Sequence, residues 1–136
     1  SRQNTTQFQA VAFGPSRNDE SQVATGGRDG CIYIWNLKTQ LLARLDAHTA
    51  WVRHLAWHPS GRRLISCSDD RSIATWDLQK ARLVHRIDAA HSDFVSGITF
   101  HAPTAILASV GADKAVRLWD SPSSPLVATD GDSAPS

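Results

Sequence analysis

The stretch HTAWVRHLAWHPSGRRLISCSDDRSIATWDL, residues 48–78, decides the fold of this chain. Apolar clusters of strand length alternate in it with turn-forming residues: Val52, Leu55 and Trp57 lead to the turn sequence HPSG, and Leu64 and Ile65 lead to the turn sequence SDD. No apolar stretch in it keeps a helical period. The stretch therefore predicts short β-strands joined by tight turns.

The same unit recurs before and after this stretch. Its tryptophan and its turn aspartate return at spacings of 41 and 43 residues, and its histidine returns once, after 43 residues. The repeated residues are Trp35, Trp76 and Trp119, then Asp29, Asp70 and Asp113, and His48 and His91. A period of this length that holds four short strands, with histidine early and Trp-Asp late, is typical of a blade of the WD-repeat propeller. The chain resembles that family over about residues 8–120, although its first copy reads Trp35-Asn36 in place of Trp-Asp.

The resemblance implies an all-β fold, a partial WD-repeat β-propeller of three four-stranded blades. We expect a polar lead-in at residues 1–7 and blades at residues 8–45, 46–87 and 88–120. Strands are expected at residues 8–13, 23–26, 31–36, 41–45, 52–57, 63–67, 72–77, 82–87, 95–100, 106–110 and 115–119. Residues 121–136 are rich in serine and proline and predict a disordered tail, so the closing blade is expected to lack its outer strand. The remaining blades of the ring would lie outside this chain.

Composition and charge narrow the classes of partner. With 136 residues, 41% of them hydrophobic and 20% charged, the chain has the composition of a globular domain. A net charge of +1 implies no general attraction to nucleic acid or to membranes, and no apolar run is long enough to span a bilayer. Cys31 and Cys67 sit at non-corresponding positions of two repeats, which predicts free thiols in a reducing, intracellular compartment. The chain has no methionine and opens inside a repeat, so we expect a fragment of a longer protein.

Histidine, serine and aspartate, the residue types of a nucleophilic triad, occur together in two copies of the unit. The two sets are His48, Ser66 and Asp70, and His91, Ser109 and Asp113. An active site is needed once, whereas a set that recurs with a tryptophan at its end, Trp76 or Trp119, predicts a structural hydrogen-bond chain from Asp through His and Ser to Trp. The first copy has Thr25, Asp29 and Trp35 but Asn4 at the place of histidine, which predicts an incomplete chain. We therefore expect no enzyme, with a hydrolase that uses the first set as the remote alternative.

Metal and cofactor sites find little support in the sequence. His48, His54, His58 and Cys67 could be imagined as zinc ligands, but their spacing matches no common zinc site. The pair Gly26-Gly27 precedes a turn to a strand and not a helix, so it does not fit a nucleotide-binding loop. We expect neither a metal nor a cofactor.

Aromatic and cationic residues flank the expected hydrogen-bond chains. The loop that carries each structural histidine and the turn that carries each structural aspartate must be neighbours, because their side chains bond. The residues that flank them therefore share one rim, and they are Arg28, Trp51, Arg53, Arg71, Phe94 and Lys114. Tryptophan and arginine are the residues most enriched at binding hot spots. Two interpretations remain open: a partner-binding rim, or aromatic lids on the blades beside ordinary solvated turn residues.

Two segments sharpen the resemblance. They read AHTAWVRHLAWHPSGRRLISCSDDRSIATWDL and AHSDFVSGITFHAPTAILASVGADKAVRLWD. They resemble the last two blades of the lissencephaly protein family, also called nuclear distribution protein F and the non-catalytic subunit of platelet-activating-factor acetylhydrolase IB. The most distinctive piece is His48 with Trp51-Val52-Arg53, followed by Cys67-Ser68-Asp69-Asp70. The chain departs from the family in an extra Ala89 and in Cys31 and Ala115, where the family usually has threonine.

In that family the propeller binds the motor domain of cytoplasmic dynein through one rim. The matching positions here are Arg28, Trp51 and Arg71, the last where the family commonly has lysine. The resemblance implies a non-enzymatic protein that binds dynein and its regulators in microtubule-based transport and nuclear migration, in the cytoplasm at microtubules and the centrosome. The alternative within the binding class is a generic WD-repeat scaffold or adaptor of the centriolar or ubiquitin-ligase type.

Overall fold

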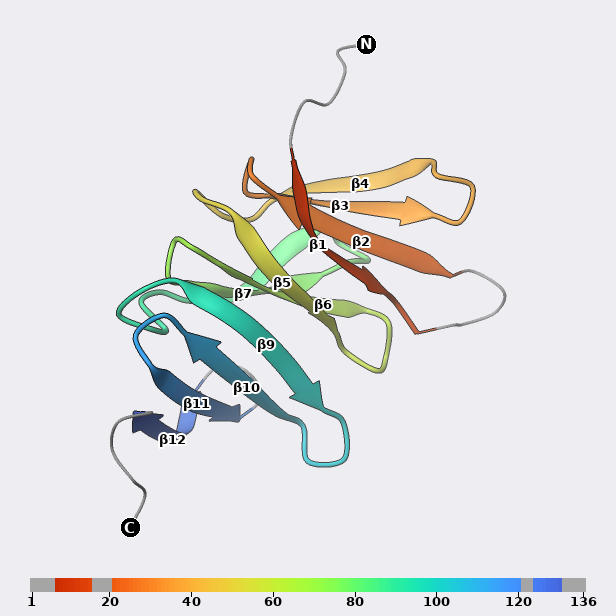
Figure 1. Cartoon of the computed structure of the whole chain (residues 1–136). Helices are drawn as coiled ribbons and strands as arrows, with labels where there is room; N and C mark the ends of the chain where they lie inside the picture. Colours follow the sequence, from red (N-terminus) through yellow and green to blue (C-terminus); the bar gives the residue numbers. More distant parts are fainter. Residues whose placement is uncertain (1–6, 16–20, 121–123, 131–136) are drawn as a thin grey trace.

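Twelve β-strands make up the described part of the chain, in three antiparallel sheets of four strands (Figure 1). The computed structural model describes residues 7–15, 21–120 and 124–130. The first sheet contains β1 (Phe8–Phe13), β2 (Gln22–Gly27), β3 (Cys31–Asn36) and β4 (Leu41–Asp46). The second contains β5 (Val52–Trp57), β6 (Arg63–Ser68), β7 (Ile73–Asp77) and β8 (Arg82–Ile87). The third contains β9 (Val95–His101), β10 (Ile106–Gly111), β11 (Ala115–Asp120) and β12 (Ser124–Asp130).

The sheets lie side by side in chain order, as blades of a propeller do (Figure 1). The first strands of the three sheets contact one another in turn, β1 with β5 and β5 with β9. The expected all-β propeller arc is confirmed by this arrangement. Among the described residues no helix is long and apolar enough to cross a membrane.

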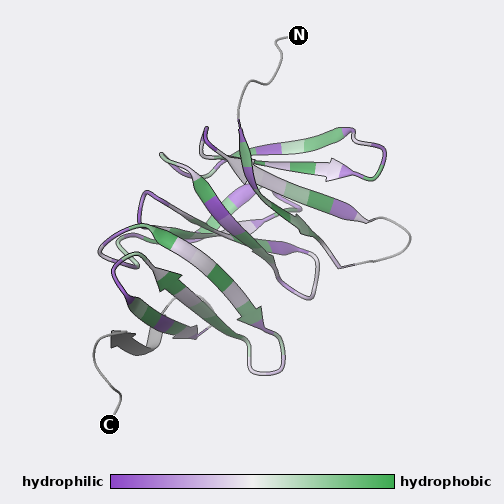
Figure 2. Cartoon of the chain, in the orientation of Figure 1, coloured by the Kyte–Doolittle hydropathy of each residue, from purple (hydrophilic) through white to green (hydrophobic). Residues whose placement is uncertain are grey.

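Two apolar cores join neighbouring sheets. Between the first and second sheets, Ile32 and Ile34 of β3 pack in one cluster with Leu55 and Trp76. Between the second and third sheets, the cluster contains Ile65, Cys67 and Ile73 on one side and Ile98, Leu107 and Trp119 on the other. Hydrophobic and hydrophilic residues alternate along many of the strands (Figure 2), because successive side chains point to opposite faces of a sheet. Each blade thus has a tryptophan face, which carries Trp35, Trp76 or Trp119, and an opposite aliphatic face, which carries isoleucine or valine side chains. In each interface, the tryptophan face of the later blade covers the aliphatic face of the earlier one.

Within the described ranges, the two outermost sheet faces have no such cover. On the first sheet, an apolar groove runs past Phe8, Phe13, Val23 and Trp35. Phe13 is 73% exposed, and its neighbour Val11 is 71% exposed. On the third sheet, Val110 and Val116 are likewise exposed. The arc thus presents an open tryptophan face at one end and an open aliphatic face at the other.

The expectation that the third blade lacks its outer strand was wrong. Strand β12 pairs with β11 in antiparallel register, from Ala115 opposite Asp130 to Asp120 opposite Ser124. Composition predicted disorder because the segment is polar and carries prolines, but an edge strand bonds to a neighbour on one side only and tolerates both. The expected disorder at residues 121–123 and 131–136 concerns residues outside the described ranges, as does most of the expected lead-in, residues 1–6. Residues 16–20, between β1 and β2, are also outside these ranges.

Candidate functional site

Backbone hydrogen bonds connect the turns and loops of one rim into a continuous surface. The His48 amide donates to the Gly30 carbonyl at 2.9 Å, and the Asp69 amide donates to the Trp51 carbonyl at 3.0 Å. Farther along, the Ala90 amide donates to the Arg71 carbonyl at 2.8 Å. Each turn between the second and third strands of a blade is thereby tied to the loop that leads into a first strand. The rim predicted to carry the flanking residues is therefore one surface.

The second blade contains a buried polar chain. His48 Nδ1 donates to Asp70 Oδ2 at 3.0 Å, which leaves Nε2, at 2.7 Å, to accept from the Ser66 hydroxyl. Ser72, which the sequence analysis did not single out, donates to Asp70 Oδ1 at 2.6 Å and lies 2.9 Å from His48 Nδ1. Its position two residues after the turn aspartate is that of Cys31 and Ala115 in the other copies, so only this blade has a hydroxyl there.

Trp76 does not join this chain, so its predicted role in the chain was wrong. Its side chain is buried, at 6% exposure, but its indole N–H has no acceptor among the described residues. The third blade differs at this point, because Trp119 Nε1 donates to Ser109 Oγ at 2.9 Å. Ser109 in turn lies 2.8 Å from His91 Nε2, and His91 Nδ1 lies 3.0 Å from Asp113 Oδ1. Among the residues that the structure describes, the chain from aspartate to tryptophan is therefore complete in the third blade alone.

In the first blade a tyrosine bonds to the turn aspartate, as histidine does in the other two blades. Trp35 Nε1 donates to Thr25 Oγ1 at 2.9 Å, and the Tyr33 hydroxyl donates to Asp29 Oδ2. Burial and the hydrogen bond to Asp29 raise the pKa of Tyr33 to about 12. Tyr33 was missed by the sequence analysis because its position holds Ala74 and Arg117 in the other copies, so no repeated residue marks it.

The turn aspartates of the second and third blades, Asp70 and Asp113, are held in their ionised form. Burial by itself raises the pKa of Asp113, but hydrogen bonds from the Ser92 amide, from His91 and from the Ala115 amide outweigh it and lower this pKa to about 2. At Asp70 burial also raises the pKa, and the hydrogen bonds from His48 and Ser72 lower it well below its ordinary range. Each carboxylate thus gathers several donors and locks the loop to the turn.

The candidate rim residues differ in how far they are available to a partner. Phe94 is 47% exposed, whereas Trp51 is only partly exposed. Arg28 and Arg71 are exposed, and within the described residues their side chains make no hydrogen bond or ion pair. Arg53 is instead engaged in an ion pair, because its guanidinium contacts Asp69 at 2.7 Å. The two free cations and the two aromatic rings therefore remain as the candidate contact residues.

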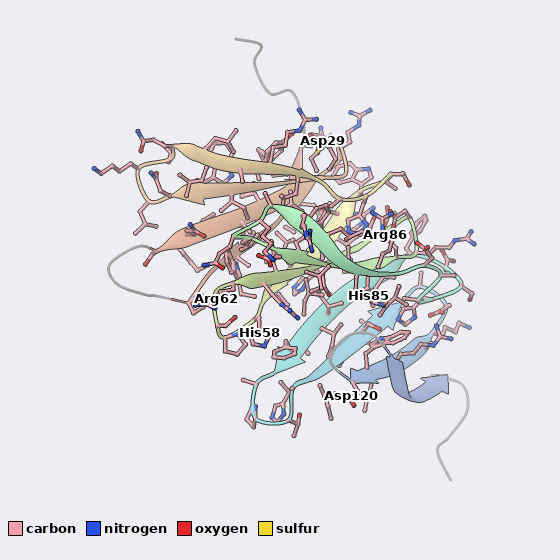
Figure 3. The ribbon with its side chains drawn as sticks, turned by 180° about the vertical axis from the view of Figure 1, so that it is seen from behind. Asp29, His58, Arg62, His85, Arg86 and Asp120 are labelled. Atoms are coloured by element: carbon pink, nitrogen blue, oxygen red, sulfur yellow. The ribbon has the colours of Figure 1, made fainter. Side chains whose placement is uncertain are left out.

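The four residues that could be imagined as zinc ligands are not gathered into one site, although His54 and Cys67 are register partners in β5 and β6. His48 lies in the loop before β5, where its amide bonds to the turn that carries Asp29, whereas His58 lies with Arg62 in the hairpin at the other end of that strand (Figure 3). His58 bonds to Ser60 and packs on the Phe100 ring, with centroids 5.2 Å apart. No group of three or more possible metal ligands is found within the described ranges.

The serine of the imagined catalytic triad is inaccessible. Ser66 is 0% exposed, as is the side chain of His48. Ser109, at the equivalent position of the third blade, is 1% exposed. A nucleophile must reach its substrate, so both sets have the geometry of internal structural links.

Comparison with known proteins gives a consistent result. The family model of the WD domain, G-beta repeat, matches residues 6–36, 39–77 and 82–120. Nuclear distribution protein nudF 2 of Talaromyces marneffei is 48% identical over 75 residues, which are 54% of this chain and 17% of that protein. Nuclear distribution protein nudF of Emericella nidulans is 46% identical over 85 residues, which are 62% of this chain and 19% of that protein.

A third relative and a solved structure complete the comparison. Nuclear distribution protein PAC1 of Tuber melanosporum is 43% identical over 83 residues, 60% of this chain and 18% of that protein. The match thus spans less than a fifth of the length of these relatives. The structure of U3-55K superposes with a TM-score of 0.84 over 96% of this chain and 41% of that one, at 22% identity, which shows a shared fold. With three matched repeats that cover most of its length, the chain belongs to the WD domain, G-beta repeat family.

Proposed function

We propose that this chain is a non-enzymatic protein-binding arc whose rim, built around Trp51, Arg28 and Arg71, binds the motor domain of cytoplasmic dynein. The chain would act in the cytoplasm, on microtubules, in nuclear migration. The observation that carries the proposal is the rim itself: two exposed cations without partners among the described residues, beside a partly exposed indole, on one hydrogen-bonded surface. The relatives named nuclear distribution proteins support the choice of dynein as the partner.

The backbone at Arg71 adds support. Arg71 has a φ of 74°, in the left-handed region where a side chain is strained by about 1 kcal/mol relative to glycine. The same turn position holds Gly30, with a φ of 78°, in the first blade and Lys114, with a φ of 67°, in the third. Glycine would therefore suit the turns of the second and third blades better, and a cation that stands there at a cost in stability is consistent with a contact made by its charged group.

The rim defines the chemistry of the partner surface. An apolar pocket that receives the Trp51 indole, bordered by carboxylates that pair with Arg28 and Arg71, would match it. The buried indole would then contribute about 2 kcal/mol or more to binding, whereas the arginines would set direction and encounter rate.

Affinity measurements with a purified fungal dynein motor domain test the proposal. Trp51→Ala should weaken binding about tenfold or more, and Arg71→Glu should weaken it in a salt-dependent manner. Arg62→Glu, at the opposite rim, is the matched charge-reversal control and should bind like the parent. If Trp51→Ala and Arg71→Glu are folded and bind as the parent does, dynein is not the partner of this rim. The scaffold or adaptor alternative would then take its place.

A further inference from the structure

Trp51, Arg53 and Asp69 form a closed cluster on the rim, here called the Trp51 clamp. Arg53 Nε and Nη2 donate to the two carboxylate oxygens of Asp69, each at 2.7 Å, in a bidentate pair. The Arg53 guanidinium carbon lies 5.2 Å from the centroid of the Trp51 ring, in cation–π contact. The Asp69 amide closes the cluster through its hydrogen bond to the Trp51 carbonyl, at 3.0 Å.

The other two blades fold without a clamp. The same backbone hydrogen bond joins Arg28 to Gln7 in the first blade, at 2.8 Å, and Ala112 to Phe94 in the third, at 2.9 Å. The position of Arg53 is in each blade the extra residue at a register shift of the first strand, and it is Gln9 in the first blade and Ser96 in the third. Such a bulge re-aims a side chain. At the positions of Trp51, Arg53 and Asp69, the first blade has Gln7, Gln9 and Arg28, and the third blade has Phe94, Ser96 and Ala112. Both of these blades have the same fold as the second, so the fold does not require the clamp.

The clamp changes the part that Arg53 plays. The Arg53 side chain is 33% exposed and the Asp69 side chain is 9% exposed, so the nearly buried Asp69 carboxylate largely neutralises the charge of Arg53. A planar guanidinium fixed in this way restrains the ring that it covers. Restraining a contact residue before binding lowers the entropy that binding must remove.

We infer that Arg53 and Asp69 are positioning residues, which hold the Trp51 indole in the orientation that it uses to bind a partner. The binding half of this inference rests on the proposed function, whereas the orientation of the indole can be measured without any partner. The inference also predicts that Asp69→Asn changes the binding affinity in the direction opposite to the one that its charge alone would give. Replacing Asp69 by Asn removes a negative charge from a rim that attracts carboxylates, so charge alone would tighten binding, whereas loss of positioning would weaken it.

The first measurement uses the free chain. With nitrogen-15-labelled tryptophan, the Trp51 indole signal is assigned by Trp51→Phe, and its heteronuclear NOE reports fast motion of the ring. We expect the NOE to fall in Asp69→Asn and in Arg53→Lys, which keeps the charge but loses the planar fork. Asp93→Asn, which removes the same charge beside Phe94, is the matched control and should leave the Trp51 signal unchanged. An unchanged NOE in both clamp variants overturns the inference, and if Asp69→Asn does not fold, Arg53→Lys decides.

The second measurement uses the dynein motor domain. Asp69→Asn and Arg53→Lys should each weaken binding by about threefold to tenfold, and neither should weaken it further in a Trp51→Ala background, because residues that act through one another are not additive. Asp93→Asn should bind as well as the parent or better. Asp69→Asn binding more tightly, as Asp93→Asn does, would show that Asp69 acts by its charge alone and would overturn positioning. If Trp51→Ala binds like the parent, the proposed function fails, and the NOE of the free chain still decides whether the clamp orients the indole.

Discussion

Ser109 bonds to two buried groups, whereas its counterpart Ser66 bonds to one. Ser109 Oγ lies 2.8 Å from His91 Nε2 and 2.9 Å from Trp119 Nε1, whereas the Ser66 hydroxyl has one hydrogen-bond partner among the described residues, His48, at 2.7 Å. Each buried polar group that loses its partner costs about 1–3 kcal/mol. Ser109 and Ser66 occupy the same position of the repeat, yet they should contribute unequally to the free energy of unfolding.

A pair of alanine substitutions tests this difference. Ser109→Ala strands both His91 and Trp119, so it should lower the free energy of unfolding by about 2–4 kcal/mol, and Ser66→Ala, which strands His48 alone, should lower it by about 1–2 kcal/mol. Urea denaturation of the two variants beside the parent measures both values. Equal losses would show that the Trp119 indole gains nothing from its bond to Ser109.

The lowered pKa of Asp113 predicts that the free energy of unfolding depends on pH. Because the pKa of Asp113 is lowered from an ordinary 3.8 to about 2 in the folded chain, the unfolded state binds protons first as pH falls. The stabilisation is therefore fully present above the unfolded value and is lost as pH falls through the folded one. We expect the free energy of unfolding to decline between about pH 4 and pH 2, and to decline less steeply in Asp113→Asn. Identical slopes for the two proteins in a urea series at these pH values would contradict the role of Asp113.

At the scale of the element, strand β12 is decisive for the third blade. It covers the edge of β11 through a backbone ladder from Ala115 to Asp120. Without it, β11 would become an edge strand with a row of unpaired backbone groups.

Truncation measures the contribution of this strand. A chain that ends at Asp120 should show faster amide hydrogen exchange in β11 and a lower thermal midpoint than a chain that ends at Asp130, because it loses the ladder between the two strands. The comparison between the two truncated chains isolates β12. Equal protection of the β11 amides in both chains would mean that β12 does not pair in solution.

At the scale of the whole molecule, the arc has two different open ends. Inside the arc, a tryptophan face always covers an aliphatic face of the preceding blade. The outer tryptophan face, with Phe13 at 73% and Leu37 at 62% exposure, and the outer aliphatic face, with Val110 and Val116, have no such cover among the described residues. Exposed apolar patches of this kind drive association.

We therefore expect the isolated chain to associate in solution. Sedimentation velocity should show a mass that grows with concentration, and Phe13→Ser with Val11→Thr should shift the distribution toward the monomer, because the tryptophan face would lose its most exposed apolar side chains. Arg62→Ser, which changes an exposed residue of a hairpin, is the control. A compact monomer at all concentrations, with a cooperative thermal transition, would contradict this expectation.

The sequence by itself determined the all-β class, the three repeats and the positions of the strands. Eleven strands were expected, and the bounds of each agree with the structure to within one residue, for instance 106–110 against Ile106–Gly111. The reason is local, because alternating apolar residues and turn sequences act within a few positions and a repeat shows them three times. The pairing of His48 with Asp70 followed in the same way, since the spacing of both residues recurs.

Only the tertiary structure decided the contacts that do not repeat. Composition predicted a disordered tail, yet β12 pairs with β11, because a partner edge can order a polar segment through its backbone. Trp76 keeps the place of the repeat but loses its hydrogen bond, while Tyr33 bonds to the aspartate of its own blade. The sequence predicts Arg53 as a candidate partner-binding residue of the rim, and the structure pairs it with Asp69. Such contacts depend on which side chains meet across loops, and a periodic pattern in one sequence carries no information about them.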